Sequence, residues 1–530
     1  MGTTCTYFSF YYENKLYSTT NLDFSIPYIH LHMSTDIIQN PIFVWFRNDL
    51  RIHDNPCLYA AIQQGKVQPI YLIDPRMFQS TSFDLPKMGK HRRRFLRESL
   101  ENLRSQLHSI GLDLLILNAM PEELFPKLLK ALPKAKLFFS YEYAYEETQI
   151  EEALAHQLTS SRWKGFWSGT LIDPENLPFT LESLPNGFST FRKKVEKYAE
   201  IPEPIATPTQ ANRLQKCDWG EDPLALSVFA ELESIDSQLQ SIQTIGCTPI
   251  NPVAHLADEF ELHGAQWELL FKGGEEAGLA RLEYYLWETD LVATYKKTRN
   301  RLVGTDYSTK FSPWLANGSL SARMIASEIH IYERQRIKND STYWVIFELL
   351  WRDFFRFAAY KYGYKWFSKG GIQSNIRKYQ HNKDYFEAWI SGQTGFSFVD
   401  ANMRELATTG FMSNRGRQNI ASFFTQNLSM DWRWGAEYFE SMLLDYDPGS
   451  NYGNWMYNAT LGHDPRNRFF NIELQADRYD SSGEYVMLWC KELIKVPPRF
   501  RHRPYLYDQS MFVPPIIDLE KSYEEIRRRE

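Results

Sequence analysis

Short apolar runs that alternate with helical segments occupy the first part of the chain and narrow the folds it can adopt. The predicted strands cover residues 42–46, 69–73, 114–117, 136–141 and 165–167. The predicted helices between them cover residues 55–64, 96–110 and 124–132. Strands that alternate with helices in this way imply right-handed crossovers and a parallel sheet. Residues 41–200 are therefore expected to form an α/β domain with a parallel five-stranded sheet.

The character of the chain changes twice after this Rossmann-like region, which contains neither a GxGxxG nor a Walker A sequence. Proline-rich, weakly patterned sequence over residues 201–265 predicts a connector between two domains. Long helical periodicities follow, so residues 266–495 are expected to form a large all-helical domain. Residues 496–530 are expected to be a short tail.

Residues 1–40 contain no arginine and a single lysine, Lys15. They lack the charged start and apolar block of a signal peptide and the arginines of a transit peptide, so organellar import is not supported. We expect a disordered extension or an upstream start-site artefact, with Met33 as the true start. The protein is expected in the cytoplasm if its source is bacterial. The sequence contains no run of eighteen apolar residues, so we expect no membrane span.

The composition limits which chemistry the chain can perform. A formal net charge of −6 over 530 residues argues against a globally basic nucleic-acid coat, so any contact with DNA must come from a local patch. The 5 cysteines form no CxxC pair, which disfavours a metal site and a disulfide framework. Aromatic residues make up 15% of the chain, and a well-packed helical core is the simplest explanation for them.

The stretch over residues 445–457 combines two carboxylates, side-chain amides and an indole. Asp447 before Pro448 is typical of a helix N-cap followed by proline at the first helical position. From that start Asp447, Asn451 and Trp455 recur every four residues and share one helical face. An ordinary capped helix with a half-exposed tryptophan explains this stretch equally well when it is taken alone.

A second polar group lies in the aromatic segment 343–357. On a helix, Trp344, Glu348 and Arg352 share one face. Glu348 and Arg352 are spaced to form an i,i+4 ion pair on a solvated surface. Because the surrounding residues are Trp, Phe and Leu, we expect the pair to be buried and to need further partners. The segment therefore favours a functional site.

Two further segments carry polar groups that need partners. Over residues 410–419, Asn414, Arg417 and Gln418 share a helical face whose amide and guanidinium heads suit a flat polar ligand. The loop over residues 306–313 is rich in hydroxyl groups, contains Lys310 and precedes a helix, and such a loop suits phosphate. Hydroxyl-rich turns before prolines are also common in loops without a ligand.

Four motifs together resemble the cryptochrome/photolyase family, and specifically its DASH subgroup. They are WFRNDLR over residues 45–51, FELLWRDFFRF over 347–357, GFMSNRGRQN over 410–419 and DYDPGSNYGNW over 445–455. The resemblance runs in order from about residue 41 to 495. It implies a folded FAD inside the helical domain and an antenna role for the α/β domain.

The resemblance implies individual roles for residues of the helical domain. Asn451 would face flavin N5, while Arg417 and Asp445 would pair beside the isoalloxazine. The implied catalytic residues are Glu348, Asn414 and Asn451. The implied FAD-binding residues are Tyr295, Ser308, Thr309, Lys310, Phe311, Ser312, Trp344, Arg352, Asn414, Arg417, Asp445, Asp447 and Asn451.

The implied substrate is a cyclobutane pyrimidine dimer in single-stranded or locally unpaired DNA, flipped into a pocket over the flavin. The implied substrate contacts are Glu348, Trp351, Arg415, Gln418 and Tyr457. The implied antenna is 5,10-methenyltetrahydrofolate, with Glu142 as its ligand. We expect no metal, and we expect a monomer.

The resemblance also implies a chain of aromatic residues that reduces the flavin in light. Trp455 and Trp432 match its first two stations, whereas Tyr379 stands where the family usually has the outer tryptophan. Because tyrosine must lose its proton when it is oxidised, we predict slower or altered photoreduction. Trp366 and Trp434 are the alternative outer stations.

The leading hypothesis is therefore light-driven repair of dimers in single-stranded DNA by electron transfer from reduced flavin. The alternative is a blue-light photoreceptor or transcriptional regulator that uses the same flavin, with or without repair. Signalling members usually carry a long carboxy-terminal extension, and only about thirty-five residues follow the predicted helical domain here. A DNA-binding module without catalysis is disfavoured by the modest net charge and the predicted buried polar residues.

Overall fold

The computed structural model describes residues 40–215, 218, 222–230, 271–375, 377–463 and 469–528. The expected amino-terminal extension lies outside the described residues, apart from Asn40. Most of the expected connector, 201–265, also lies outside them. None of the described helices is long and apolar enough to cross a membrane.

The predicted parallel sheet is present with five strands. They are β1 (Pro41–Phe46), β2 (Lys66–Ile73), β3 (Leu115–Asn118), β4 (Lys136–Ser140) and β5 (Trp163–Phe166). The strand order is β3-β2-β1-β4-β5, and every neighbouring pair is parallel. The fold class predicted for this region is therefore confirmed. β5 ends at Phe166, so Trp167 lies just beyond the strand in which it was expected.

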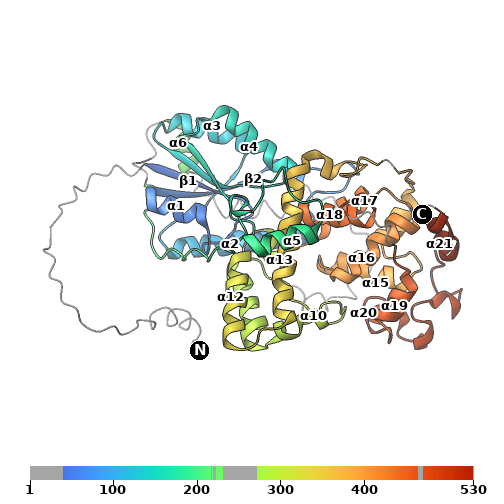
Figure 1. The fold of residues 1–530 in the computed structure, drawn as a ribbon. Coiled ribbons are helices and arrows are strands. Elements are labelled where there is room, and N and C mark those ends of the chain that lie inside the picture. The colour runs from blue at the N-terminus through green and yellow to red at the C-terminus, as the bar shows by residue number, and fades with distance from the viewer. Residues whose placement is uncertain are drawn as a thin grey trace, which may run out of the picture. The chain divides into compact units, whose positions relative to one another are not determined.

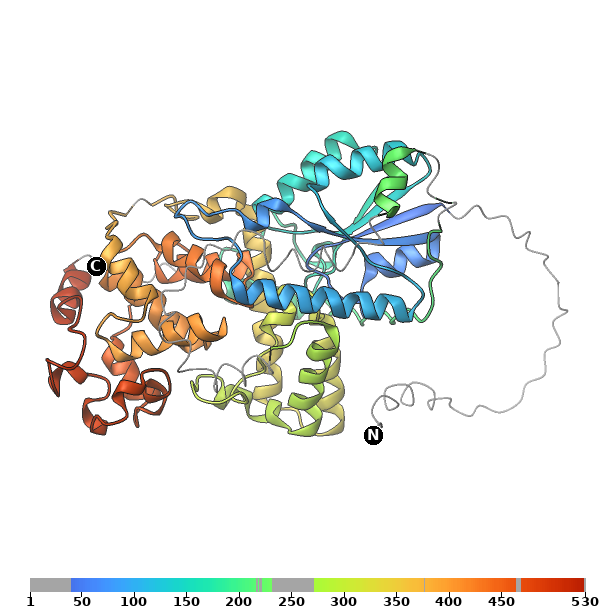
Figure 2. The ribbon, with the colours of Figure 1, turned by 180° about the vertical axis from the view of Figure 1, so that it is seen from behind.

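Helices cover both faces of this sheet (Figures 1 and 2). They do so because the side chains on both faces of β1 are apolar. The helices of this region are α1 (Pro56–Gln64), α2 (Lys90–Ser109), α3 (Pro121–Ala131), α4 (Tyr145–Gln157), α5 (Phe188–Tyr198) and α6 (Pro223–Ala230). Val44 packs in one apolar cluster with Leu100 of α2. Phe43, its neighbour in β1, packs on the opposite face with Leu128 of α3.

The sheet has a topological switch point between β1 and β4. From β1 the chain proceeds through β2 to β3 on one side, and then returns to place β4 on the other side of β1. Asn48 follows β1 and Glu142 follows β4 at the same carboxyl edge. Ligands of open α/β sheets bind in the crevice at such a point. Glu142 therefore lies at the switch point of the sheet.

The rest of the described chain is helical, as predicted. Its helices are α9 (Glu275–Glu283), α10 (Tyr295–Thr298), α11 (Ser312–Ala316), α12 (Ala322–Gln335), α13 (Asp340–Tyr362), α14 (Lys383–Ile390), α15 (Ser397–Thr409), α16 (Asn414–Ser422), α17 (Trp432–Met442), α18 (Pro448–Asn458), α19 (Ile472–Tyr479), α20 (Glu484–Trp489) and α21 (Leu519–Arg528). Their apolar faces share one large core.

α13 is the longest of these helices and positions much of the candidate site. It starts with a capping box in which Asn339 accepts hydrogen bonds from the backbone of Ser341 and Thr342. It ends at Gly363, whose positive φ suits glycine. α13 packs against α10 and α18. Side chains from its whole length are therefore held among other helices.

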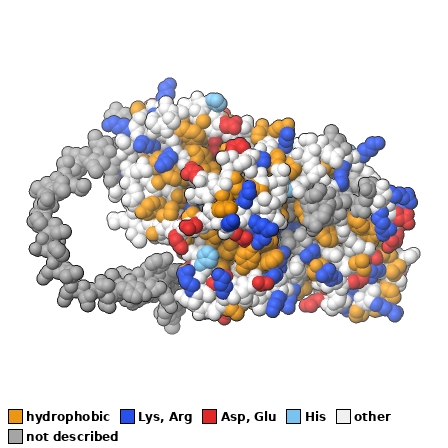
Figure 3. All heavy atoms as spheres, in the orientation of Figure 1, with side chains coloured by type: hydrophobic (Ala, Val, Ile, Leu, Met, Phe, Trp, Pro, Cys, Tyr) orange, Lys and Arg blue, Asp and Glu red, His pale blue; other side chains and the backbone are white. Residues whose placement is uncertain are grey.

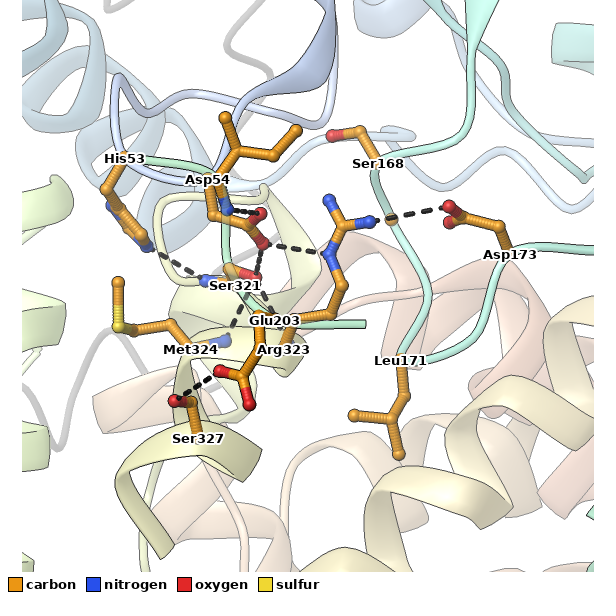
Figure 4. A network of polar contacts seen from close by, with 12 residues as sticks. His53, Asp54, Ser168, Leu171, Asp173, Glu203, Ser321, Arg323, Met324 and Ser327 are labelled. Carbon is orange, nitrogen blue, oxygen red and sulfur yellow. Dashed lines mark hydrogen bonds and ion pairs between the residues drawn. The ribbon is translucent and has the colours of Figure 1, made fainter. Parts of the chain in front are cut away.

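A buried polar network joins the loop after β1 to the start of α12 (Figure 4). Asp54 accepts hydrogen bonds from the Ser321 hydroxyl and from Arg323 Nε, the latter at 3.0 Å. Arg323 also reaches Asp173 with Nη1, at 3.4 Å. Both Asp54 and Arg323 are almost fully buried. Because breaking one partner would leave a buried charge unpaired, this network holds the sheet region on the helices.

Two further contacts cross the same boundary. His53 Nδ1 lies 2.6 Å from Glu275 Oε1, on the first turn of α9. On α13, the carboxylate of Asp353 accepts hydrogen bonds from the backbone N–H groups of Leu171 and Ile172 at 3.0–3.1 Å. The relative position of sheet and helices is thus set by buried, directional bonds.

The tail also packs on the helical region, although no element was predicted in it. Tyr523 and Ile526 of α21 are buried in the large core. The Tyr523 hydroxyl accepts a hydrogen bond from the backbone N–H of Ile472 at 2.9 Å. The apolar spacing of Leu519, Tyr523 and Ile526 was the available signal.

Charged side chains of both signs are interspersed with apolar ones over the face of the molecule seen in Figure 3. This distribution agrees with the formal net charge of −6. A basic contact surface must therefore be local.

Candidate functional site

Asp447 caps α18 as predicted and also anchors a buried network. Its Oδ1 accepts a hydrogen bond from the Ser450 backbone N–H at 2.8 Å. Its Oδ2 accepts from Arg356 Nη2 at 2.7 Å, from Arg356 Nε at 3.0 Å and from the Tyr143 hydroxyl at 2.6 Å. Burial opposes the charge, but Arg356 and Arg352 hold the pKa of Asp447 well below its usual range.

Arg352 and Arg356 lie one turn apart on α13 and converge on the same backbone carbonyl. Each donates a hydrogen bond to Gly169 O at 2.6 Å, and Arg352 also donates to Leu315 O at 2.8 Å. A Cβ at position 169 would lie 2.5 Å from Arg356 Nη1, so any other residue there would displace the end of this guanidinium. Burial, reinforced by the charge of Arg356, lowers the pKa of Arg352 to about 10.

Asp445 forms the centre of a second group, on the segment before α18. Its Oδ2 accepts from Arg417 Nη2 at 2.9 Å and from the Ser312 hydroxyl at 2.6 Å. Arg417 is oriented by a further bond from its Nε to Met412 O at 2.8 Å. The predicted pairing of Arg417 with Asp445 is confirmed. The Oδ1 atom of Asp445 is buried and has no partner among the described residues, so it is available to a ligand.

Asn451 and Trp455 lie on the face of α18 that packs on α17. The Asn451 Nδ2 donates a hydrogen bond to Ala436 O at 2.9 Å. This bond fixes the orientation of the amide, so that Oδ1 is the atom left to accept a hydrogen bond. Trp455 is almost fully buried and lies over Gly435, where a Cβ would be 2.1 Å from its ring.

Glu348 is paired with Arg299 of the chain segment after α10 rather than with Arg352. The expected i,i+4 ion pair on α13 is therefore wrong, because Arg352 turns toward Gly169 and Leu315. Glu348 accepts hydrogen bonds from Arg299 Nη1 and, at 3.0 Å, from Trp344 Nε1. Burial raises the pKa of Glu348, although Arg299 opposes the rise.

Cations also gather around Trp344, at the edge of this group. Lys296 Nζ lies 4.5 Å from the centroid of the indole and Arg299 Cζ lies 5.5 Å from it. Tyr295, at the start of α10, is buried, and burial raises its pKa because neutral phenol is favoured there. The structure thus brings Tyr295, Trp344 and Glu348 together.

Arg281 of α9 donates hydrogen bonds to the backbone of the loop before α11. Arg281 donates from Nε to Thr309 O at 3.0 Å and from Nη2 to Ser308 O at 3.1 Å. Lys310 adopts a left-handed backbone with φ of 59°. Its Nζ lies 3.6 Å from the centroid of the Tyr307 ring, and burial lowers the pKa of the lysine. The cation expected at a phosphate therefore lies over an aromatic ring, and Phe311 is part of the core.

The proposed substrate contacts differ in exposure and surroundings. Trp351 stacks on Phe188 of α5 with ring centroids 3.7 Å apart. Arg415 donates to Asn300 Oδ1 at 3.1 Å, and Gln418 Oε1 is buried without a partner among the described residues. Tyr457 is half-buried. Asn414, which the resemblance implies as a catalytic and FAD-binding residue, is exposed as the first residue of α16.

The predicted electron-transfer residues lie around the start of α17. Trp432 is fully buried and donates from Nε1 to Lys369 O at 3.2 Å. Gln380 N donates to Ser429 O at 2.8 Å, which places Tyr379 beside the start of α17. Lys369 Nζ lies 5.5 Å from the centroid of the Tyr379 ring. No contact between the rings of Tyr379 and Trp432 is present in the structure as described.

Glu142 lies apart from these groups, at the carboxyl edge of the sheet. Its Oε1 accepts from the Asn48 backbone N–H at 3.3 Å and from Asn48 Nδ2 at 3.0 Å. Its own backbone N–H donates to Glu151 at 2.9 Å, and Glu151 in turn pairs with Arg47. Glu142 is thus held at the switch point between β1 and β4.

Sequence reasoning missed several residues that hold these groups in place, namely Tyr143, Arg281, Arg299 and Arg356. Arg356 follows Arg352 by four residues on a predicted helix, so its position on the same face was a usable signal. Arg281 carried no signal, because its partners lie 24 to 28 residues away in an irregular loop.

The unsatisfied atoms fit a large polar cofactor. Asp445 Oδ1 and Gln418 Oε1 are buried acceptors without partners among the described residues, and Asn451 Oδ1 is oriented as an acceptor. Acceptors of this kind, beside an arginine, suit a ring system that carries N–H groups.

Comparison with known proteins identifies the domains of this chain. Residues 344–529 match the FAD binding domain of DNA photolyase, and residues 42–210 match the family DNA photolyase. The chain is therefore a flavoprotein of photolyase type, with an α/β domain followed by an FAD-binding helical domain.

The relatives narrow this class. A cryptochrome DASH from Synechocystis is 44% identical over 88% of this chain and 90% of its own length, and one from Gloeobacter violaceus is 45% identical over 88% of each. The chain belongs to the cryptochrome/photolyase family, and these relatives are cryptochromes of the DASH subgroup. The crystal structure of a Synechocystis cryptochrome covers 92% of this chain and 99% of its own, with a TM-score of 0.79 and 41% identity.

Proposed function

We propose that this protein uses bound FAD and blue light to repair cyclobutane pyrimidine dimers, preferentially in single-stranded DNA. The observation that carries this proposal is the group formed by two buried residues, Asp445 and Asn451, and the partly buried Arg417 that pairs with Asp445. A charged pair and an oriented amide are costly to bury unless a ligand completes their bonds.

The residues of this group would bind and orient the flavin. Asn451 Oδ1, held by the bond from Nδ2 to Ala436 O, would accept the hydrogen bond of the flavin N5–H. Arg417 beside Asp445 would balance the charge of the reduced ring. Asp447 acts one step away as a positioning residue, since its carboxylate already accepts bonds from Arg356, Tyr143 and Ser450. When bound, the flavin supplies the light-driven electron.

The surroundings of Glu348 support a pocket for the flipped dimer. Glu348 would form a hydrogen bond with the pyrimidine edge; burial raises the pKa of its carboxyl, although Arg299 opposes the rise. Trp351, which is half-buried and stacks on Phe188, offers an indole on which a base can stack. Gln418 brings an acceptor, Oε1, that has no partner among the residues the structure describes. Asn414 and Tyr457 would complete the contacts.

Cations near this pocket support contact with the phosphate backbone. Lys296, Arg299 and Arg415 lie around Trp344 and the start of α16. Such residues position nucleic acid without reading its sequence. Preference for single strands follows from the lower cost of extruding an unpaired base.

The position of Glu142 supports a separate ligand in the α/β domain. Its carboxylate lies at the switch point of the sheet, beside Asn48. We propose 5,10-methenyltetrahydrofolate as an antenna at this place, because a carboxylate suits the N–H groups of a pterin.

The test measures blue-light loss of dimers from single-stranded and duplex oligonucleotides, with the flavin reduced beforehand and a dark sample as control. We expect repair in light, faster on the single strand. Glu348→Ala should weaken repair while the absorption spectrum still reports bound flavin. A chain that binds flavin and repairs neither oligonucleotide refutes the proposal and favours the photoreceptor function.

A further inference from the structure

Tyr452 of α18 makes a direct aromatic contact with Trp432. The two ring centroids are 6.0 Å apart and the rings are nearly perpendicular, with an interplanar angle of 82°. Phe367 covers the tyrosine ring from another side at 4.6 Å. Tyr452 is buried and lies between Asn451 and Trp455 in the sequence of α18. It is thus an oxidisable side chain beside the second station of the proposed electron-transfer chain.

The hydroxyl of Tyr452 has a proton acceptor of its own. It donates a hydrogen bond to Glu440 Oε2, on the neighbouring helix α17, at 3.1 Å. A general base must lie within such a distance of the proton it takes. Burial raises the pKa of Glu440 to about 7, although Arg92 and Lys87 oppose the rise. The titratable groups that face Glu440 are Arg92, Lys87, Glu146, Tyr446 and Tyr452.

Tyr379, the residue expected at the outer station, has no such proton acceptor among the described residues. Its hydroxyl is buried and has no hydrogen-bond partner among the residues that the structure describes. Burial, with the charge of Asp431, raises the pKa of Tyr379 to about 12, and burial also raises the pKa of Tyr452 well above its usual value, so the two phenols differ in the proton acceptor that Tyr452 has. Oxidation of a buried phenol that cannot release its proton would leave an uncompensated cation. Tyr379 is therefore poorly placed as an electron donor.

We propose that Tyr452, with Glu440 as proton acceptor, reduces oxidised Trp432 and ends the electron-transfer chain. One electron passes from the phenol of Tyr452 to the indole radical cation of Trp432. The phenolic proton passes along the existing hydrogen bond to Glu440. Trp432 returns to its neutral form, Tyr452 becomes a neutral radical and Glu440 becomes a carboxylic acid, so charge and atoms balance.

The inference rests on the proposed function, because the oxidant of Trp432 is the photoexcited oxidised flavin, acting through Trp455. The experiment therefore begins with the absorption spectrum of the full chain, which reports flavin binding. A blue flash is then followed by transient absorption and electron paramagnetic resonance, which distinguish tryptophan from tyrosine radicals. The variants are Tyr452→Phe and Glu440→Gln, with Tyr438→Phe on α17 as a matched control.

We expect a neutral tyrosyl radical in the unmodified chain and in Tyr438→Phe. Tyr438 is buried and its hydroxyl also lacks a partner among the described residues, so its loss tests the effect of removing a buried phenol. Tyr452→Phe should leave the tryptophan radical and abolish the tyrosyl signal. Glu440→Gln should slow tyrosyl formation at least about a hundredfold, the usual contribution of a positioned base.

The pH dependence gives a readout without any substitution. The tyrosyl yield of the unmodified chain should rise as pH increases through about 7, where Glu440 becomes the carboxylate that accepts the proton. A tyrosyl signal that survives Tyr452→Phe, or one that Tyr379→Phe abolishes, overturns the inference while flavin binding and repair stand. A chain that binds no flavin overturns both the inference and the proposed function.

Discussion

Removing the charge of Asp447 should destabilise the protein strongly, because this carboxylate balances a buried guanidinium. Asp447→Asn keeps the size of the side chain but removes the carboxylate charge that accepts two hydrogen bonds from Arg356. The Asp447 and Arg356 side chains are 6% and 3% exposed, so water cannot replace the lost partner. Breaking a buried ion pair of this kind costs about 3–5 kcal/mol.

The assay is urea unfolding at neutral pH, followed by tryptophan fluorescence, with Glu524→Gln as the control. Glu524 pairs with Arg528 at the surface, where the two side chains are 58% and 77% exposed, so its loss should leave the midpoint almost unchanged. The double variant Asp447→Asn with Arg356→Met should recover much of the loss, because it removes the orphaned charge. A loss below about 1 kcal/mol in Asp447→Asn would refute the reasoning.

Three further predictions concern packing, pH and flavin binding. Gly435→Ala should lower the free energy of unfolding by about 1–3 kcal/mol, because its Cβ would overlap the ring of Trp455; Gly187→Ala, with nothing within 4 Å, is the control in the same thermal melts. Burial lowers the pKa of His91 to about 4. Its contribution to the free energy of unfolding is therefore complete above the unfolded pKa of about 6.5 and falls by about 3 kcal/mol as the pH is lowered toward about 4. His91→Gln should flatten this part of the profile of stability against pH. Arg281→Met removes bonds to three loop carbonyls and should weaken FAD binding at least about tenfold in equilibrium dialysis; unchanged retention would contradict a role for this loop.

The local pattern of residues determined most of the fold. Alternating apolar runs and helical spacing predicted the five strands and the change to an all-helical region, because these signals depend on neighbours within one element. The N-cap at Asp447 was likewise readable, since a cap bonds to a residue three positions later. The pairing of Arg417 with Asp445 came from the family resemblance and not from spacing.

Partner choice was decided by the tertiary structure. Glu348 had a local partner at Arg352, yet it pairs with Arg299, 49 residues away, because Arg352 is drawn to the carbonyl of Gly169. An i,i+4 spacing produces an ion pair only when neither side chain has a closer partner on a neighbouring element. Such competition depends on distances between elements, which periodicity does not contain.

The pairing of Tyr452 with Glu440 illustrates the same limit at the candidate site. The sequence determined that Tyr452 stands in a helix beside Asn451 and near Trp455. Only the packing of α18 on α17 decided that its ring meets Trp432 and that its hydroxyl meets a buried carboxylate. The physical reason is that burial and proximity together set whether a proton can move, and both are properties of the folded chain.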